Sequence, residues 1–229
     1  MLKRVVAIHD ISCVGKCSLT VALPVLSAAG IECSVLPTAV LSTHTGGFTG
    51  YTFRDLTDDM APIARHWESL SLSVDAFYTG YLGSVEQTEL VRQLIHRLKN
   101  EKSFVFVDPA MADNGKLYAG FDLHFVEGMA ALCREADIII PNLTEAAFLL
   151  NEPYQENGYT RRDIQALLRR LSDMGPQQVI LTGITYEPGR IGAAAYDRRT
   201  DRYCEYLDEQ VDGYFHGTGD LFASAVLSA

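Results

Sequence analysis

Basic side chains are in the minority in this chain. Its 229 residues include 19 Lys and Arg against 29 Asp and Glu, which gives a formal net charge of −10. Proteins that bind nucleic acids carry a basic stripe or patch for the phosphates, so we expect no nucleic-acid partner here. A small phosphate-bearing ligand is not excluded, because metal ions and backbone N–H groups can supply a local positive field.

Cysteines are few, and long apolar runs are missing. The five cysteines are an odd number and contain no Cys-x-x-Cys pair, which favours reduced thiols in a cytoplasmic protein. Cys13 and Cys17 lack a nearby His or Cys that would complete a zinc site. The apolar run Val5–Ile8 stops at His9 and is too short for a signal peptide. No run reaches the length of a membrane span, so we expect no membrane association.

Short apolar runs alternate with stretches of helical periodicity along the whole chain. Continuous apolar strands separated by helices predict a mainly parallel sheet with helices on both faces. We therefore expect one α/β domain over residues 1–229, a three-layer α/β/α structure, with a late antiparallel pair at Ile191–Tyr196 and Arg202–Leu207. The predicted earlier strands are Val5–Ile8, Val35–Leu41, Ala76–Thr79, Phe104–Val107, Ile138–Ile140 and Val179–Thr182.

Polar residues follow the predicted strands at the edge where open α/β sheets bind ligands. They are Asp10 to Ser12, His44 with Thr45, Tyr81, Asp108, Asn142 and Thr182.

The strongest local signal is Gly217-Thr218-Gly219-Asp220, which precedes an apolar run. Glycines that open a helix let backbone N–H groups point at an anion, and the helix dipole adds to the attraction. Asp220 is placed to take a proton from a hydroxyl that attacks a phosphate held there. The structural alternative is a loop-to-helix junction in which Asp220 only complements the dipole.

Two further loops carry carboxylates. Asp108 and Asp113 lie after the fourth strand and could hold hydrated Mg²⁺ near phosphates, or could belong to a solvated turn. Asn142 and Glu145 after the fifth strand have the spacing of a reciprocal helix cap. In the functional alternative, Glu145 reaches Mg²⁺ through water and Asn142 reaches a phosphate.

Together these segments resemble the ribokinase-like superfamily and, within it, the pyridoxal kinase family. The run Gly217–Ala223 resembles the anion hole and base of the superfamily, and Ser42-Thr43-His44-Thr45-Gly46 resembles a Ser-Asn-His-Thr segment. Thr79-Gly80-Tyr81 matches a Thr-Gly-Tyr, Asp108-Pro109 with Asp113 resembles an Asp-Pro-Val-x-Gly-Asp loop, and Pro141-Asn142 with Glu145 resembles Pro-Asn-x-x-Glu. The segments appear in the order of the family and span nearly the whole chain.

The resemblance implies an ATP-dependent kinase that phosphorylates the 5′-hydroxymethyl group of B6 vitamers, as a homodimer. Asp220 would be the base, and the N–H groups of Gly217, Thr218 and Gly219 would hold the transferring phosphoryl group. The family pattern further implies pyridine contacts from Ser12, Thr45 and Tyr81, nucleotide contacts from Asp113, Asn142, Thr182, Thr218 and Gly219, Mg²⁺ organised by Asp108 and Glu145, and possible use of K⁺.

The sequence departs from the family pattern at several positions. Ala112 stands where the family has Gly, Thr43 where it has Asn, and Ile140 where it often has a Thr that helps to bind a cation. The chain also stops soon after Asp220, where relatives continue, so we expect a kinase domain shortened at its C-terminal end.

Three alternatives remain open. A hydroxymethylpyrimidine kinase shares Gly-Thr-Gly-Asp but carries a Gly-rich, Gln-Ala-Asp segment after the first strand, where this chain has Ser12-Cys13-Val14-Gly15-Lys16-Cys17. A sugar or nucleoside kinase would show an early Gly-Gly substrate segment, which is not evident. A non-catalytic protein that binds B6 vitamers would follow if the short C-terminus abolished turnover.

Overall fold

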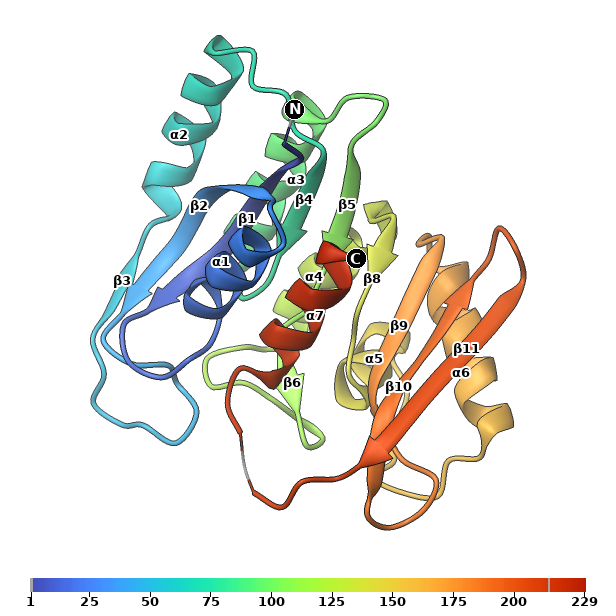
Figure 1. Cartoon of the computed structure of the whole chain (residues 1–229). Helices are drawn as coiled ribbons and strands as arrows, with labels where there is room; N and C mark the ends of the chain where they lie inside the picture. The colour runs from blue at the N-terminus through green and yellow to red at the C-terminus, as the bar shows by residue number, and fades with distance from the viewer. Residues whose placement is uncertain (1, 214) are drawn as a thin grey trace. The chain divides into compact units, whose positions relative to one another are not determined.

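The computed structural model describes residues 2–213 and 215–229, and the chain divides into two compact units. Unit 1 is Met1–Phe106 with Phe215–Ala229, and unit 2 is Val107–Tyr214. In both, apolar strands alternate with helices, as the sequence predicts (Figure 1). The central strand of unit 1 pairs in parallel with both of its neighbours. Among its described residues, unit 2 has one parallel pair, and its other strand pairs are antiparallel. Each unit carries one group of the residues that the sequence singles out.

Unit 1 contains the strand order β5-β4-β1-β2-β3. Strand β1 lies between β4 and β2, is parallel to both, and is buried over almost its whole length, so it forms the core of the unit. Helices α1 and α7 pack against each other, and Figure 1 shows them in front of these strands with α3 behind. The elements are β1 (Arg4–Ser12), α1 (Leu19–Ala28), β2 (Glu32–Leu41), β3 (Phe53–Asp55), α2 (Thr57–Ser69), β4 (Ala76–Thr79), α3 (Val85–Leu98), β5 (Phe104–Val107) and α7 (Thr218–Ser228).

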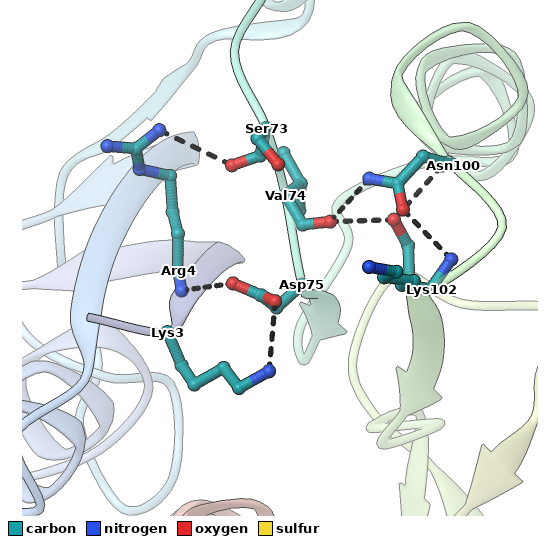
Figure 2. A network of polar contacts seen from close by, with 8 residues as sticks. Lys3, Arg4, Ser73, Val74, Asp75, Asn100 and Lys102 are labelled. Atoms are coloured by element: carbon teal, nitrogen blue, oxygen red, sulfur yellow. Dashed lines mark hydrogen bonds and ion pairs between the residues drawn. The ribbon is translucent and has the colours of Figure 1, made fainter. Parts of the chain in front are cut away.

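A polar network joins the amino ends of the strands in unit 1 (Figure 2). The carboxylate of Asp75 accepts the backbone N–H of Arg4 at 2.8 Å and the ammonium group of Lys3 at 3.3 Å. The next residue along the chain towards the N-terminus, Val74, offers its carbonyl oxygen to Asn100 Nδ2 at 3.0 Å and to the Ser103 hydroxyl at 2.6 Å. These bonds tie the amino ends of β1, β4 and β5 together. They lie at the opposite end of β1 from Asp10 and Ser12.

Unit 2 contains the strand order β11-β10-β9-β8, with β8 parallel to β9 and an antiparallel β9-β10-β11 meander. Helix α6 packs on β9 and β10 through Ile164, Leu167, Leu168 and Leu171, the spacing that the sequence shows. The elements are β6 (Ala112–Asp113), β7 (Lys116–Leu117), α4 (Leu123–Glu135), β8 (Ile138–Ile139), α5 (Leu143–Leu150), α6 (Arg161–Asp173), β9 (Gln178–Ile184), β10 (Arg190–Asp197) and β11 (Arg202–Glu209).

One detail differs from the predictions made from sequence. Thr182 lies inside β9, because the strand continues to Ile184 instead of ending at residue 182. Pro37 lies within β2 without ending it, and the register between β1 and β2 shifts just beyond its partner, His9. A bulge of this kind accommodates a residue that has no N–H to donate.

Among the described residues, no helix is both long and apolar enough to cross a membrane. All five cysteines are free thiols.

Candidate active site

The helix that Gly217 opens is held tightly against the loop before α1. Gly217 has a φ of +72°, which disfavours any residue with a side chain, and a Cβ here would lie 2.0 Å from the carbonyl oxygen of Lys16. Only glycine lets the two backbones approach so closely. Thr218 and Gly219 follow in an exposed first turn, where helix N–H groups are available to an anion.

Asp220, in the same first turn, is aimed at the loop before α1. Its Oδ2 accepts the backbone N–H of Ser18 at 2.8 Å. Burial, opposed by the Ser18 N–H and assisted by the charge of Asp10, raises the pKa of Asp220 to about 6. A carboxylate with such a pKa is largely ionised at pH 7 and still a useful proton acceptor.

Asp10, near the end of β1, is a second buried carboxylate beside Asp220. Its Oδ2 accepts the Ser12 hydroxyl at 2.8 Å, and only 3% of the residue is exposed. Burial raises its pKa, and the hydroxyls of Ser18 and Ser12 oppose the rise. The thiol of Cys17 lies in the same cluster, where burial raises its pKa to about 11 and keeps it protonated.

The three residues predicted to contact a ring all lie in unit 1. Ser12 is buried and bonded to Asp10, whereas Thr45 is exposed in the loop after β2. Tyr81 is half-buried, and burial followed by the charge of Asp10 raises the pKa of its phenol to about 12. Ser12 and Tyr81 therefore both lie close to Asp10, so the structure brings these two together around one carboxylate.

Two histidine rings flank this cluster. His44 is buried, and its ring centroid lies 4.1 Å from that of His216 and 4.9 Å from that of Phe48. His44 Nδ1 accepts the Gly46 N–H at 3.1 Å, so its protonated form would lose this bond. The pKa of His44 is lowered by burial and then by His216, so the ring favours its neutral form.

Sequence reasoning missed the importance of Asp10, Ser18 and His9. Asp10 was noted only as a polar residue near a strand end, and Ser18 only gains meaning from its distant partner Asp220. His9 is fully buried, and in the described part of the chain neither of its ring nitrogens has a hydrogen-bond partner. His9 and Asp10 could have been singled out, because two polar residues directly follow the apolar run Val5–Ile8. The sequence offers no such indication for Ser18.

In unit 2, Asn142 and Glu145 form the reciprocal cap of α5 that their spacing predicts. Asn142 Oδ1 accepts the Glu145 N–H at 2.9 Å, and Glu145 Oε2 accepts the Asn142 N–H at 2.9 Å. Glu145 Oε1 also accepts the Met111 N–H at 3.2 Å, and Asn142 Nδ2 donates to the Ala112 carbonyl at 2.9 Å. The pair therefore fastens the loop after β5 to α5.

The other predicted residues of unit 2 lie around this cap. Asn142 forms an isolated parallel bridge with Thr182, whose N–H donates to the Pro141 carbonyl at 3.0 Å. Asp108 is buried directly after β5, and the N–H of Ile140 donates to the neighbouring Val107 carbonyl at 3.0 Å. Asp113 is exposed in β6. Asp108, Asn142 and Thr182 thus all lie in unit 2, where Asn142 and Thr182 are direct neighbours.

Asp108 and Glu145 are the carboxylates of unit 2 that the family resemblance suggested as magnesium ligands. Burial raises the pKa of Glu145 to about 8, and a nearby positive charge would favour its ionised form. No group of three or more His, Cys, Asp or Glu side chains is arranged to hold a metal ion in residues 2–213 and 215–229. Magnesium commonly uses only one or two protein carboxylates, with water and substrate phosphates as its other ligands, so Asp108 and Glu145 fit that mode.

Comparison with known proteins identifies the family. The model of the phosphomethylpyrimidine kinase family matches residues 23–229. The chain belongs to this family. A Bacteroides thetaiotaomicron structure named for phosphomethylpyrimidine kinase, in a crystal form with pyridoxal, is 42% identical over 100% of this chain and 80% of its own, with a TM-score of 0.95.

Two other relatives of this chain are named for the phosphorylation of B6 vitamers. Pyridoxal kinase from Lactobacillus plantarum is 32% identical over 100% of this chain and 81% of its own, with a TM-score of 0.89. A pyridoxine/pyridoxal/pyridoxamine kinase from Bordetella avium is 27% identical over 98% of this chain and 76% of its own. The resemblance to pyridoxal kinases of the ribokinase-like superfamily, inferred from sequence, is confirmed, and so is the α/β fold class.

Proposed function

We propose that this chain is an ATP-dependent kinase that transfers a phosphoryl group to the 5′-hydroxymethyl group of pyridoxal, pyridoxine or pyridoxamine. The observation that carries the proposal is Asp220, a partly buried carboxylate in the first turn of α7 with a pKa raised to about 6. A base at the mouth of an anion-binding helix suits transfer of phosphate to an alcohol. The relative crystallised with pyridoxal, at 42% identity, supports the choice of acceptor.

On the acceptor side, Asp220 takes the hydroxyl proton as the bond from the acceptor oxygen to the γ-phosphorus of ATP forms, while the bond from that phosphorus to the ADP oxygen breaks and ADP leaves. The backbone N–H groups of Gly217, Thr218 and Gly219 face the charge on the transferring group. Ser12, Thr45 and Tyr81 contact the ring; the buried position of Ser12 and the half-buried position of Tyr81 support this role.

For the nucleotide, we propose phosphate contacts from Asp113, Asn142 and Thr182, and likewise from Thr218 and Gly219, as the family resemblance implies. Asp108 and Glu145 would organise Mg²⁺. Glu145 would act through water, because both of its oxygens already accept backbone N–H groups. Bound Mg²⁺ would neutralise charge that develops on the phosphates. Use of K⁺ remains part of the proposal.

We propose that the two units act as one kinase domain, and that the chain works as a homodimer in the cytoplasm. The kinase names of its relatives support an enzymatic role over binding without turnover.

A hydroxymethylpyrimidine is the second candidate acceptor, because the matching family model is named for phosphomethylpyrimidine kinase. Both acceptors are aromatic nitrogen rings that carry a hydroxymethyl group, so the same base can serve either. The deciding experiment is a coupled ADP-release assay across pyridoxal, pyridoxine, pyridoxamine and hydroxymethylpyrimidine. The highest kcat/KM should fall on a B6 vitamer; the highest value on the pyrimidine, or no turnover of any vitamer, would contradict the proposal.

A further inference from the structure

Ser18 is held in an unusual backbone conformation between the buried carboxylate of Asp10 and the partly buried carboxylate of Asp220. Its φ is +50° and its ψ is −131°, a region that residues with a side chain rarely occupy. Such conformations persist only where the surrounding structure holds them, and they cluster at functional sites. The strain at Ser18 therefore needs a compensating interaction.

Ser18 also lacks the capping hydrogen bond that is usual for its position. It is the N-cap residue of α1, where a serine hydroxyl normally accepts an N–H from the first turn, yet its side chain makes no capping bond. Instead its hydroxyl interacts with the carboxylate of Asp10, and its N–H donates to Asp220 Oδ2 at 2.8 Å. A single residue thus links the end of β1 to the first turn of α7.

Other titratable groups surround this link. Asp10 comes from β1, Cys17 from the loop before α1, and Tyr78 from β4, with its hydroxyl 3.3 Å from Ser224 Oγ in α7 and 3.5 Å from the Asp220 carbonyl. His44 and His216 lie in the loops after β2 and before α7, and Lys16 presents its carbonyl to Gly217. Of these groups, Asp10 is the one whose charge acts on the Asp220 carboxylate.

We propose that Asp10 and Ser18 are positioning residues for Asp220: Ser18 holds the carboxylate in place through its N–H, and Asp10 both anchors Ser18 and repels the ionised base. The two influences oppose each other. The Ser18 N–H favours the ionised carboxylate, whereas the charge of Asp10 and burial favour the protonated one. The catalytic role of this arrangement rests on the proposed kinase function. The effect of Asp10 and Ser18 on the protonation of Asp220 does not depend on that function.

The opposition allows a test in which two substitutions move one quantity in opposite directions. The carboxyl ¹³C signal of Asp220, assigned by its absence in Asp220→Asn, is titrated in the whole chain without substrate. Asp10→Asn keeps an oxygen acceptor for Ser12 and Ser18 but removes the charge, so the Asp220 midpoint should fall by about one pH unit. Ser18→Ala removes the anchor at a strained position, so the N–H should move away and the midpoint should rise.

Ser71→Ala is the matched control, because Ser71 has a φ of +51° at an exposed position after α2. It should leave the midpoint unchanged and should show any general effect of alanine at a positive φ. If the wild-type chain phosphorylates a B6 vitamer, the acidic limb of its kcat profile should follow the same two shifts. Absence of B6 kinase activity would end the proposed function while the titration still decides the coupling. Unchanged midpoints, or shifts of the same sign in Asp10→Asn and Ser18→Ala, would overturn the positioning role.

Discussion

Gly217 and Lys16 approach so closely that a Cβ on residue 217 would lie 2.0 Å from the Lys16 carbonyl oxygen. Gly217→Ala must therefore move the start of α7 or the loop before α1, in addition to adopting a φ of +72°. We expect a loss of about 1–3 kcal/mol in the free energy of unfolding, measured by urea denaturation. Gly219→Ala is the matched control, since a Cβ there meets nothing within 4 Å, and it should be as stable as the wild type.

Asp220→Asn keeps the size of the side chain but removes the base. A positioned base contributes about 10²- to 10⁴-fold to such proton transfers, so kcat for the preferred vitamer should fall by that factor while KM stays within several-fold. Steady-state kinetics at pH 7.5 provide the measurement, with the exposed Asp212→Asn as control. Near-normal kcat in Asp220→Asn would return Asp220 to the role of a helix-capping carboxylate.

His9 should make the fold sensitive to acid. Burial lowers the pKa of His9 to about 3, from 6.5 in the unfolded chain. The neutral ring is therefore favoured in the folded state, so this contribution to stability is fully present above pH 6.5 and is lost as the pH falls toward 3. At pH 5 the loss is about 2 kcal/mol.

His9→Leu removes the titrating group, while the leucine side chain still fills the space beside Tyr78. Urea denaturation at pH 7 and pH 5 should show that the wild type loses about 2 kcal/mol more than the variant. Equal losses in the two proteins would mean that His9 is not held in its neutral form.

Asn142 should contribute more to stability than an ordinary helix cap. Asn142→Ala removes the cap of α5 and also leaves the Ala112 carbonyl without the Asn142 amide, so we expect a loss of about 2–3 kcal/mol. Asp122 is the exposed N-cap of α4, and its carboxylate accepts the Phe125 N–H at 3.0 Å. Asp122→Ala should therefore lower the free energy of unfolding by about 1 kcal/mol. Thermal and urea denaturation of both variants provide the measurement, and equal losses would mean that the bond to Ala112 adds nothing.

The sequence by itself determined the family, the alternation of strands and helices, and the residues that cap them. Asn142 and Glu145 could be paired in advance because a capping box is a local interaction between residues three apart. The antiparallel pair β10 and β11 was predicted for a similar reason, since its strands are neighbours along the chain.

The tertiary structure alone decided what surrounds Asp220. Ser18 and Asp220 are 202 positions apart, and no local pattern predicts that the N–H of one meets the carboxylate of the other. The buried state of Asp10 and His9 depends likewise on β2 and β4, which pack on both sides of β1. Local propensity is set by neighbours along the chain, whereas pKa values and charge coupling are set by neighbours in space, which only the folded structure brings together.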